Sequence, residues 1–484
     1  MSTEREPTPA HPLFERAARP SRRALLRGAL GVAALGGLSA HPAFGFSGAL
    51  ERLSASADPL APRRPHFRPR AKRVIFLFMH GGPSQVDTFD YKPLLERDHG
   101  KPLPFAKPRV QFAETGDLMK SPWKFRQHGQ SGAWVSELFP HVAGQVDKLC
   151  FLKAVHGTNE AHGGALLALH TGSDTFVRPS MGSWILYGLG SENPDLPGYV
   201  TLCPTLGHGG VNNWSSAFLP GSYQGTPIGH AGIPAAEARI EHLAELPGRA
   251  GLERLELELL EDLNRRHLEA RPGDPALEAR LRSYELAFRM QREAPLVLDI
   301  GQESAATRAL YGLDDPVTEN FGRQCLMARR LSESGVRFVQ CTHSYKWDQH
   351  GDLERDHLKN AREVDRPIAA LLEDLGRRGL LEETLVLWGG EFGRTPTSQG
   401  NGRDHNPQGF TLWMAGGGVK PGFSYGATDD YGYYALTDKL HVHDLHATLL
   451  ALLGLDHERL TYRYAGRDFR LTDVAGHVAE AIFA

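Results

Sequence analysis

The fold is decided by the stretch VIFLFMHGGPS at residues 74–84. Six apolar residues, Val74 to Met79, follow one another without interruption, and His80, two glycines and Pro83 then end the run. A continuous apolar run of this length, bounded by turn residues, is typical of a strand that is buried on both faces, as in a parallel sheet. We therefore expect a parallel strand here, with His80 directly after its carboxyl end.

Three more stretches are short apolar runs typical of buried strands, and helical patterns lie between them. The strand-like runs are VRFVQC at 336–341, TLVLW at 384–388 and FTLWMA at 410–415. Apolar residues at i, i+3, i+4 and i+7 predict a one-faced helix over 368–375, and a similar pattern covers 444–454. Alternating strands and helices predict an α/β fold with a doubly wound, mostly parallel sheet and helices on both faces.

The composition changes between about residue 234 and residue 296, where Glu, Leu and Arg dominate, as in LERLEL at 252–257. This pattern predicts a helical insertion packed on the sheet, within an α/β domain that spans about 73–475. The charges of the insertion fit a solvated helix face better than a binding surface.

The amino-terminal segment has the features of a twin-arginine export signal. Ser21–Arg23 precede an apolar, small-residue run from Gly28 to Ala40, which is shorter than the roughly 20 residues of a membrane span. The sequence AFG at 43–45 fits a cleavage site. We expect 1–45 to be a signal peptide read by the twin-arginine machinery, 46–72 to be a linker, and the mature protein to be periplasmic or secreted. The alternative is a basic amphipathic helix or a retained anchor; no other stretch predicts a transmembrane helix.

The overall composition excludes several classes of protein. The 484 residues carry a formal net charge of −3, so nothing indicates a nucleic-acid partner, and 41% hydrophobic residues can form a core. The four cysteines form no C-x-x-C pair, which argues against a disulfide scaffold or a cysteine-based zinc site. They are Cys150, Cys203, Cys325 and Cys341.

In open α/β sheets, ligands bind at the carboxyl ends of the strands, so the residues that follow each strand are candidates for a site. Imidazole and carboxylate groups can bind a divalent metal such as Zn²⁺, Mn²⁺, Mg²⁺ or Ca²⁺. The candidate metal ligands are His80 after the first strand, Asp348 and His350 after the second, Glu391 after the third, and Asp404 and His405 in the next loop. Each histidine taken alone is more often a surface or hydrogen-bonded residue than a ligand. Their recurrence at successive strand ends is the reason to predict a metal site.

Two arginines near these candidates have two interpretations. Arg394 and Arg403 can each bind an anion through two parallel hydrogen bonds. They can equally hold the loops together by pairing with Glu391 or Asp404. The sequence leaves both interpretations open.

A second candidate lies in TNEAHGG at 158–164, before the helix-like stretch 165–170. Backbone N–H groups at a helix start favour a bound anion. His162 is the side chain there best suited to nucleophilic or acid–base chemistry near neutral pH. We predict His162 as the catalytic residue; the alternative is that this loop only caps the helix.

With these motifs assembled, the chain resembles the DUF1501 family, proteins of unassigned function within the alkaline-phosphatase-like superfamily. The resemblance covers roughly residues 70–475. It rests on HGGPSQVDTFDYKP at 80–93, SELFP at 136–140, RPSMGSW at 178–184, and LLEET at 380–384 followed by GEFGRTP at 390–396. It implies an alkaline-phosphatase-like fold and the transfer of a phosphoryl or sulfuryl group with one or two divalent metals.

The chain departs from the superfamily's ligand pattern at several positions. His80 stands where the resemblance implies an aspartate, and Phe392 stands where it implies a histidine ligand. Asp348 and His350 resemble the ligands of the other metal, with unusual spacing. His405 resembles the late histidine that precedes Asn-Pro. One intact metal site, or a rearranged one, is therefore expected.

The nucleophile of the superfamily also has no direct counterpart. Counted back ten residues from Gly172, its position falls on His162, where the resemblance implies a Ser, Thr or modified Cys. A histidine there implies a nucleophile, an acid or base, a metal ligand, or a site that no longer performs this chemistry.

Two main hypotheses follow for the function. The first is an exported metal-dependent hydrolase of phosphate or sulfate esters, acting on a small-molecule or glycan ester. The second is a non-catalytic, alkaline-phosphatase-like binding protein of the cell envelope, with a glycan or protein partner. A structural role in an envelope assembly is a third, and the sequence carries no signal for it.

Overall fold

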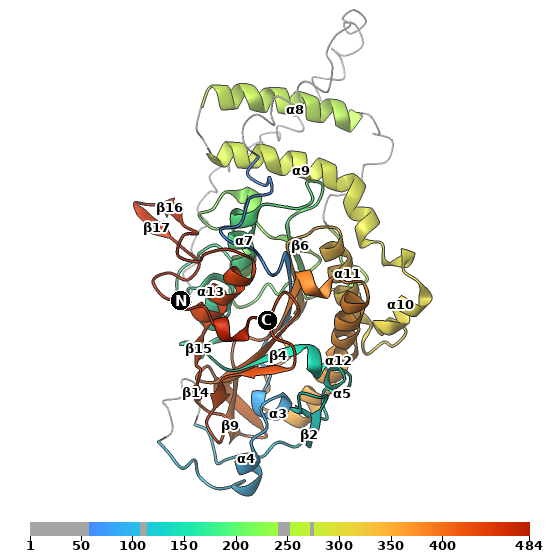
Figure 1. Ribbon diagram of the computed structural model, residues 1–484. Helices are drawn as coiled ribbons and strands as arrows, with labels where there is room; N and C mark the ends of the chain where they lie inside the picture. The colour runs from blue at the N-terminus through green and yellow to red at the C-terminus, as the bar shows by residue number, and fades with distance from the viewer. Residues whose placement is uncertain (1–57, 107–113, 241–251, 272–274) are drawn as a thin grey trace, which may run out of the picture. The chain divides into compact units, whose positions relative to one another are not determined.

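The computed structural model describes residues 58–106, 114–240, 252–271 and 275–484 (Figure 1). The predicted signal peptide and the linker up to residue 57 lie outside the described residues. A nine-stranded sheet forms the centre of the described domain. In spatial order its strands are β12 (Phe423–Tyr425), β4 (Leu149–His156), β11 (Phe410–Ala415), β8 (Thr384–Gly389), β1 (Arg73–Met79), β7 (Phe338–His343), β5 (Tyr199–Leu202) and β6 (Thr226–Ile228), with β15 (Leu440–His441) also paired to β4.

The direction of the strands confirms the predicted fold class. β1 pairs in parallel with β7 and β8, so that Ile75 lies opposite Val339 and Val386. The other pairings of the described sheet are also parallel, except that β11 is antiparallel to both β8 and β4. The sheet is therefore mostly parallel, as the sequence predicts.

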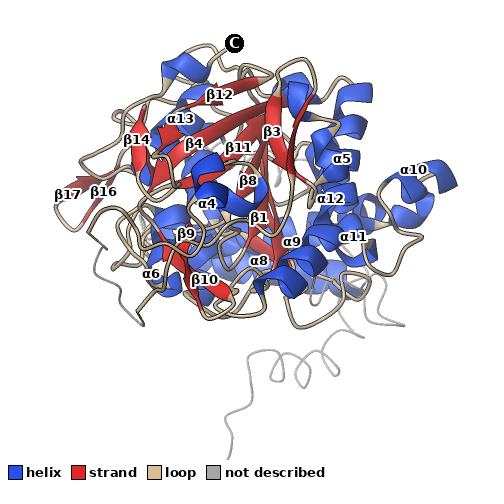
Figure 2. Cartoon of the chain, turned by 90° about the horizontal axis from the view of Figure 1, so that it is seen from below, coloured by secondary structure: helices blue, strands red, loops and turns tan. Residues whose placement is uncertain are grey.

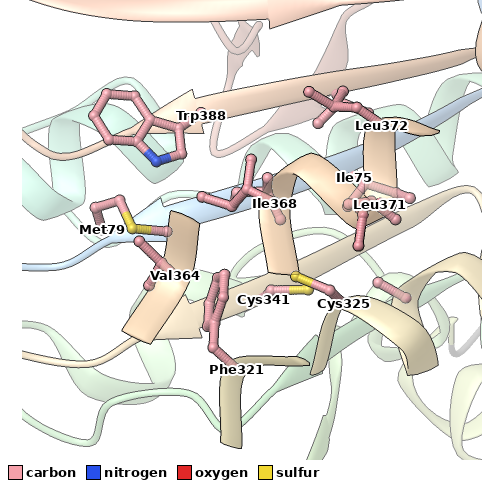
Figure 3. Close-up of a cluster of buried hydrophobic side chains, with 14 of the residues drawn as sticks. Ile75, Met79, Phe321, Cys325, Cys341, Val364, Ile368, Leu371, Leu372 and Trp388 are labelled. Carbon is pink, nitrogen blue, oxygen red and sulfur yellow. The ribbon is translucent and has the colours of Figure 1, made fainter. Parts of the chain in front are cut away.

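The two faces of strand β1 pack into two different hydrophobic clusters, because successive side chains of a strand point to opposite faces. Ile75 and Met79 belong to one cluster and Phe76 and Phe78 to the other. Figure 2 shows helices on both sides of the sheet, and Figure 3 shows Ile75 and Met79 near side chains of α11 and α12. The helices are α5 (Pro140–Ala143), α11 (Glu319–Glu333) and α12 (Leu353–Arg377) in the first cluster, and α6 (His162–Thr171), α7 (Met181–Leu189) and α13 (Val442–Leu452) in the second. Burial on both faces explains why the 74–79 run has no polar residue.

Some element boundaries differ from the sequence prediction. The strand predicted at 336–341 is β7, shifted by two residues, because its parallel pairing with β1 continues until His343 lies opposite Met79. The helix predicted at 444–454 is α13, which starts at Val442. His441 caps it and donates its own backbone N–H to Asp444, which fixes the earlier start.

Helices α8 (Leu252–Glu269) and α9 (Pro275–Leu298) lie side by side at one end of the domain (Figure 1). α9 packs against α11 and against the short helix η3 (Gly221–Tyr223), whereas α8 lies on α9. Both fall in the range where the sequence predicts a helical insertion. None of the described helices combines the length and the hydropathy that crossing a membrane requires.

Smaller elements surround the sheet, and the antiparallel pair of β9 and β10 carries several residues of the site described below. These elements are α3 (Gln85–Thr88), α4 (Pro93–Arg97), β2 (Phe125–His128), β3 (Ala133–Ser136), η1 (Val146–Lys148), η2 (Gly210–Trp214), η4 (Ile300–Gln302), α10 (Ala305–Leu310), η5 (Leu381–Glu383), β9 (Gly393–Gln399), β10 (Gly402–Asn406), β13 (Ala427–Thr428), β14 (Ala435–Thr437), β16 (Tyr462–Tyr464), β17 (Arg467–Phe469) and η6 (Glu480–Ile482).

Candidate metal centre

The predicted site residues meet at one edge of the sheet. β1, β7 and β8 are parallel neighbours, so the loops that follow them share an edge. The N-terminus of α6 and strand β10 add side chains to the same place. The residues brought together in this way are His80, His162, Asp348, His350, Glu391, Asp404 and His405.

The carboxylate of Asp348 is the centre of the cluster. Arg394 Nη2 donates to its Oδ1 at 2.8 Å. Burial alone would raise the pKa of Asp348, but hydrogen bonds from three imidazoles and the charge of Arg394 outweigh it and hold this pKa far below its usual range. A divalent cation could replace the protons that the imidazoles share with this oxygen. The distances from Oδ1 are 3.0 Å to His350 Nε2, 3.1 Å to His405 Nε2 and 3.3 Å to His162 Nε2.

Three imidazoles form a first ligand group, which reaches Asp348 through His162. Ligand atoms of His80, His162 and His208 all fall within 4.8 Å of one another. His80 Nε2 is 3.2 Å from His208 Nδ1, whereas His80 Nδ1 is buried with no hydrogen-bond partner among the described residues. Burial lowers the pKa of His80 to about 4, which keeps the ring neutral, the form that binds metals.

The sequence interpretation missed His208, which lies in the loop after β5. This residue has a φ of +46°, and non-glycine residues in that strained region cluster at functional sites. The available signal was the one that identified His80: a histidine among glycines, LGHGG at 206–210, soon after a strand. The strand itself, Tyr199–Leu202, is too short to stand out as an apolar run.

Glu391 holds His162 in one orientation. His162 Nδ1 lies 2.7 Å from Glu391 Oε1, and the backbone N–H of Gly81 donates to both carboxylate oxygens of Glu391, at 3.0 and 3.2 Å. Burial raises the pKa of Glu391, but the hydrogen bond from His162 and the charges of His80 and His162 have the larger effect and lower this pKa to about 2. Burial lowers the pKa of His162, whereas the hydrogen bonds to Asp348 and Glu391 raise it to about 9. With Nδ1 engaged, Nε2 is the nitrogen that faces the cluster.

A second ligand group reaches the same oxygen of Asp348 through His350 and His405. His350, Asp404 and His405 also place ligand atoms within 4.8 Å of one another, and His350 Nε2 is 2.9 Å from His405 Nε2. His405 Nδ1–H donates to the carbonyl oxygen of Glu160 at 2.6 Å, so the unprotonated nitrogen of the neutral ring, the one that can bind a metal, is Nε2. The two groups therefore meet at Asp348 and at the face-to-edge contact between His162 and His405.

Phe392 occupies the position where the resemblance implies a histidine ligand. Its ring centroid lies 4.4 Å from that of His405 and 4.9 Å from that of His162. The side chain thus contributes packing between two imidazoles and no ligand atom.

The two arginines hold loops together, although with other partners than the sequence suggested. Arg403 forms a bidentate pair with Asp87, at 2.7 and 3.1 Å, and both side chains are fully buried. Arg394 donates to Asp348 and to the carbonyl oxygens of Gly81, Gly82 and Trp347. All these donors are directed at the protein itself, so anion binding is not their role here.

His343, which also follows β7, is turned away from the cluster. Its Nε2 lies 2.8 Å from Glu363, and its Nδ1 accepts a hydrogen bond from the indole N–H of Trp347 at 2.9 Å. Both ring nitrogens are therefore engaged by partners outside the cluster.

Residues 71–483 match the family described as "Protein of unknown function (DUF1501)". The chain belongs to the DUF1501 family. A comparison with curated proteins gave no match. The description of the family assigns no activity, so the function of this DUF1501 protein has to be argued from the site itself.

Several solved structures are similar to this DUF1501 protein at low identity. The sulfatase PsFucS1 from Pseudoalteromonas sp. is 13% identical over 85% of this chain and 71% of its own, with a TM-score of 0.34. The lipoteichoic acid synthase LtaP from Listeria monocytogenes is 8% identical over 86% and 80%, with a TM-score of 0.38. The alkaline phosphatase from the Antarctic bacterium TAB5 is 9% identical over 80% and 99%, with a TM-score of 0.35. At these TM-scores the likeness carries no argument about chemistry.

Gly81→Ala is expected to destabilise the metal-free protein by about 1–3 kcal/mol. Gly81 has a φ of +115°, and a Cβ there would lie 2.7 Å from the backbone nitrogen of Asp348 and 2.8 Å from the backbone of Trp347. The control is Gly100→Ala, because Gly100 has a φ of +77° with no atom within 4 Å of a Cβ. Urea unfolding measures both variants. An equal loss of stability in both would show that the contact with the Asp348 loop is unimportant.

Tyr345→Phe is expected to weaken metal binding by about tenfold while the fold stays intact. The Tyr345 hydroxyl donates to Asp348 Oδ2 at 3.2 Å, and the residue has a strained φ of +41°. Calorimetric titration of the metal-free protein with Zn²⁺ measures the change. Tyr464→Phe is the control, because Tyr464 is similarly exposed but lies on β16. Unchanged Zn²⁺ affinity in Tyr345→Phe would show that the hydroxyl does not help to position Asp348.

Proposed function

We propose that this DUF1501 protein is an exported, metal-dependent hydrolase of phosphate or sulfate esters with a non-standard active site. The observation that carries the proposal is the shared carboxylate of Asp348. Its Oδ1 lies within 3.3 Å of imidazole nitrogens from the start of α6, the loop after β7 and strand β10. His80 and His208 extend the cluster on the side of His162, and Asp404 extends it on the side of His350. Two ligand groups joined in this way suit divalent cations on both sides of Asp348.

The chemistry of the donor set fits a divalent metal. Imidazole nitrogens suit Zn²⁺ better than Mg²⁺ or Ca²⁺, which prefer oxygen ligands. Nδ1 of His80 supports this fit, because it is buried without a hydrogen-bond partner in the part of the chain that the structure describes, and such an atom is costly. The residues that would hold metal are His80, His208, Asp348, His350, Asp404 and His405, and His162 lies among them as the acid–base residue. When bound, the metal would supply positive charge at the oxygen on which negative charge develops.

The chain's own residues can provide the proton transfer. Hydrolysis adds the oxygen of water to phosphorus or sulfur, breaks the bond to the ester oxygen and leaves that oxygen in need of a proton. His162 is placed to donate this proton, since hydrogen bonds to Glu391 and Asp348 raise its pKa to about 9 against the effect of burial. The water loses one proton to solvent, and His162 is reprotonated from solvent.

The proposed location of this activity is the cell envelope or the exterior. The arginine pair Arg22–Arg23 and the apolar run after it support export by the twin-arginine machinery. That route carries folded proteins, which suits an enzyme loaded with metal before export. A small-molecule or glycan ester in that compartment is the proposed substrate class.

The test combines metal analysis with a panel of ester substrates. The purified full chain is expected to contain a divalent metal and to hydrolyse at least one phosphate monoester, phosphate diester or sulfate ester. His162→Gln should abolish turnover, and His343→Gln, which changes a histidine outside the cluster, should retain it. A metal-free protein that turns over no ester after reconstitution with Zn²⁺ or Mn²⁺ would overturn the proposal.

One observation favours the non-catalytic alternative. The stretch NEAHGGA at 159–165, which leads into α6 and includes its first residues, contains no Ser, Thr or Cys to act as the superfamily's nucleophile. In that case the centre would bind metal and a glycan or protein partner without turnover. Metal content together with an inactive wild type across the whole panel would support this second function.

A further inference from the structure

A run of basic residues leads into strand β1. The stretch RRPHFRPRAKR at 63–73 holds six arginines and lysines, and the sequence has no aspartate or glutamate from residue 59 to residue 86. Five of these six basic side chains are exposed, and Arg73 is half-buried. The whole chain carries a net charge of −3, so this stretch is a local concentration of positive charge. We call residues 63–73 the basic segment.

The backbone of the basic segment is fixed to the end of α13 and to the residue that follows it. The N–H groups of His66 and Phe67 donate to the carbonyl oxygen of Gly454 at 2.8 and 3.2 Å. The N–H of Arg70 donates to the carbonyl oxygen of Leu452 at 2.8 Å. A partner that binds the side chains of this segment does not have to order its backbone first, which lowers the entropic cost of binding.

The arginines at the start of the basic segment have no carboxylate partner. Arg64 and Arg68 form no hydrogen bond or ion pair with any residue that the structure describes. Arg63 donates to two backbone carbonyl oxygens and to the hydroxyl of Tyr223, which are uncharged groups. The positive charge of these three arginines is therefore available to an anionic partner.

The other end of the basic segment is largely neutralised. Lys72 pairs with Glu383 at 2.6 Å, and Arg73 pairs with Glu192 at 2.9 Å. Arg70 donates to a backbone oxygen of the last residue. The net positive charge is thus concentrated on residues 63–68.

Phe67 adds an exposed apolar ring to this charge. Its side chain is 45% exposed, and it lies in the sequence between Arg64 and Arg68. An aromatic ring beside arginines suits a lipid headgroup region, where the ring reaches the acyl boundary and the guanidinium groups bind phosphate. A phosphate polymer without apolar groups would leave the ring in water. A duplex nucleic acid is contacted by more basic residues than three in a typical complex.

We propose that the basic segment docks this protein on an anionic phospholipid surface. Arg63, Arg64 and Arg68 bind lipid phosphates, and Phe67 enters the headgroup region. The segment lies at the amino end of β1, whereas the metal centre lies at the carboxyl end of this strand, about 20 Å away at the rise of a β-strand. Docking therefore leaves the metal centre open, and the proposal is independent of the ester hydrolysis proposed above.

The first experiment measures co-sedimentation of the purified full chain with vesicles at low salt. Vesicles of phosphatidylcholine with phosphatidylglycerol are expected to bind more protein than phosphatidylcholine alone. Arg64→Glu with Arg68→Glu should lower the partition coefficient onto the mixed vesicles at least about 20-fold, since each basic residue near an anionic surface contributes about fivefold. The apolar run at 28–40 is common to all variants, so the comparison between variants isolates the basic segment.

Lys124→Glu with Arg126→Glu is the matched control. Both residues are exposed and lie at the start of β2, outside the basic segment. The control changes the net charge by the same amount as the test variant, and it should bind the mixed vesicles as the wild type does. Urea unfolding, measured in parallel, reports that each variant is folded.

A second experiment tests the position of Phe67. In Phe67→Trp, the added fluorescence should shift to shorter wavelength when the mixed vesicles are present, because the ring leaves water. Tyr464→Trp is the control, since Tyr464 is 50% exposed on β16 and should show no shift.

The proposal would be overturned by equal binding of the wild type and of Arg64→Glu with Arg68→Glu to the mixed vesicles. An unchanged spectrum of Phe67→Trp on bound vesicles would likewise contradict it. Retention on immobilised heparin without any vesicle binding means that the partner is a polyanionic polymer and not a lipid surface.

Discussion

Asp348→Asn is expected to reduce the affinity for divalent metal at least about 100-fold and to abolish ester turnover. Asn retains the size of the side chain but removes the negative charge. In the wild type, nitrogens of His162, His350 and His405 share Asp348 Oδ1. The amide of Asn offers these nitrogens a single, uncharged oxygen. Each contact that Asp348 makes with the two ligand groups is weakened by this single change. Elemental analysis of the purified variant and calorimetric titration with Zn²⁺ measure the loss.

The control for this substitution is Asp352→Asn. Asp352 follows Asp348 by four residues, is about half exposed and pairs with Arg355 outside the cluster. It should keep the wild-type affinity. An Asp348→Asn protein that is folded by circular dichroism and binds Zn²⁺ as the wild type does would show that the cluster is not a metal centre.

The strand-end rule explains why so much of this site could be predicted from sequence. His80, Glu391 and Asp348 follow strands that read as apolar runs, and parallel pairing brings the ends of those runs to one edge. The same rule failed for His208, because the strand before it is four residues long. A short strand at the side of a sheet has too few residues to produce a recognisable run.

The roles of Arg394 and Arg403 could not be chosen from sequence for a different reason. Each partner is far along the chain: Asp87 is 316 residues from Arg403, and Gly82 is 312 residues from Arg394. Composition and spacing carry no information on such pairs. In the structure, the contacts of Arg394 and Arg403 explain the HGGPSQVD motif. Residues of this motif bind the β9–β10 pair to the loop after β1 and so hold in place the ligands on both segments.

The pair between Asp87 and Arg403 leads to the largest expected effect on stability. Asp87→Asn is expected to destabilise the protein by about 3–5 kcal/mol, because it leaves a buried guanidinium without its carboxylate. The remaining acceptors of Arg403 are carbonyl oxygens of Thr395, Met119 and Lys120, which carry no full charge. Urea unfolding measures the change. The double variant Asp87→Asn with Arg403→Met should recover most of the loss, since no unpaired charge then remains.

The pH dependence of unfolding gives an independent check on this pair. Burial raises the pKa of Asp87, but the charge of Arg403 and hydrogen bonds from Arg403 and Ser84 lower it below its usual value. A depressed carboxylate pKa contributes stability that is fully present above the unfolded value of about 3.9 and is lost as the pH falls towards the folded value. Between pH 5 and pH 3 the wild type should therefore lose more stability than the double variant. Parallel curves for the two proteins would mean that the pair does not contribute through its charge, and the loss in Asp87→Asn would then have to come from packing.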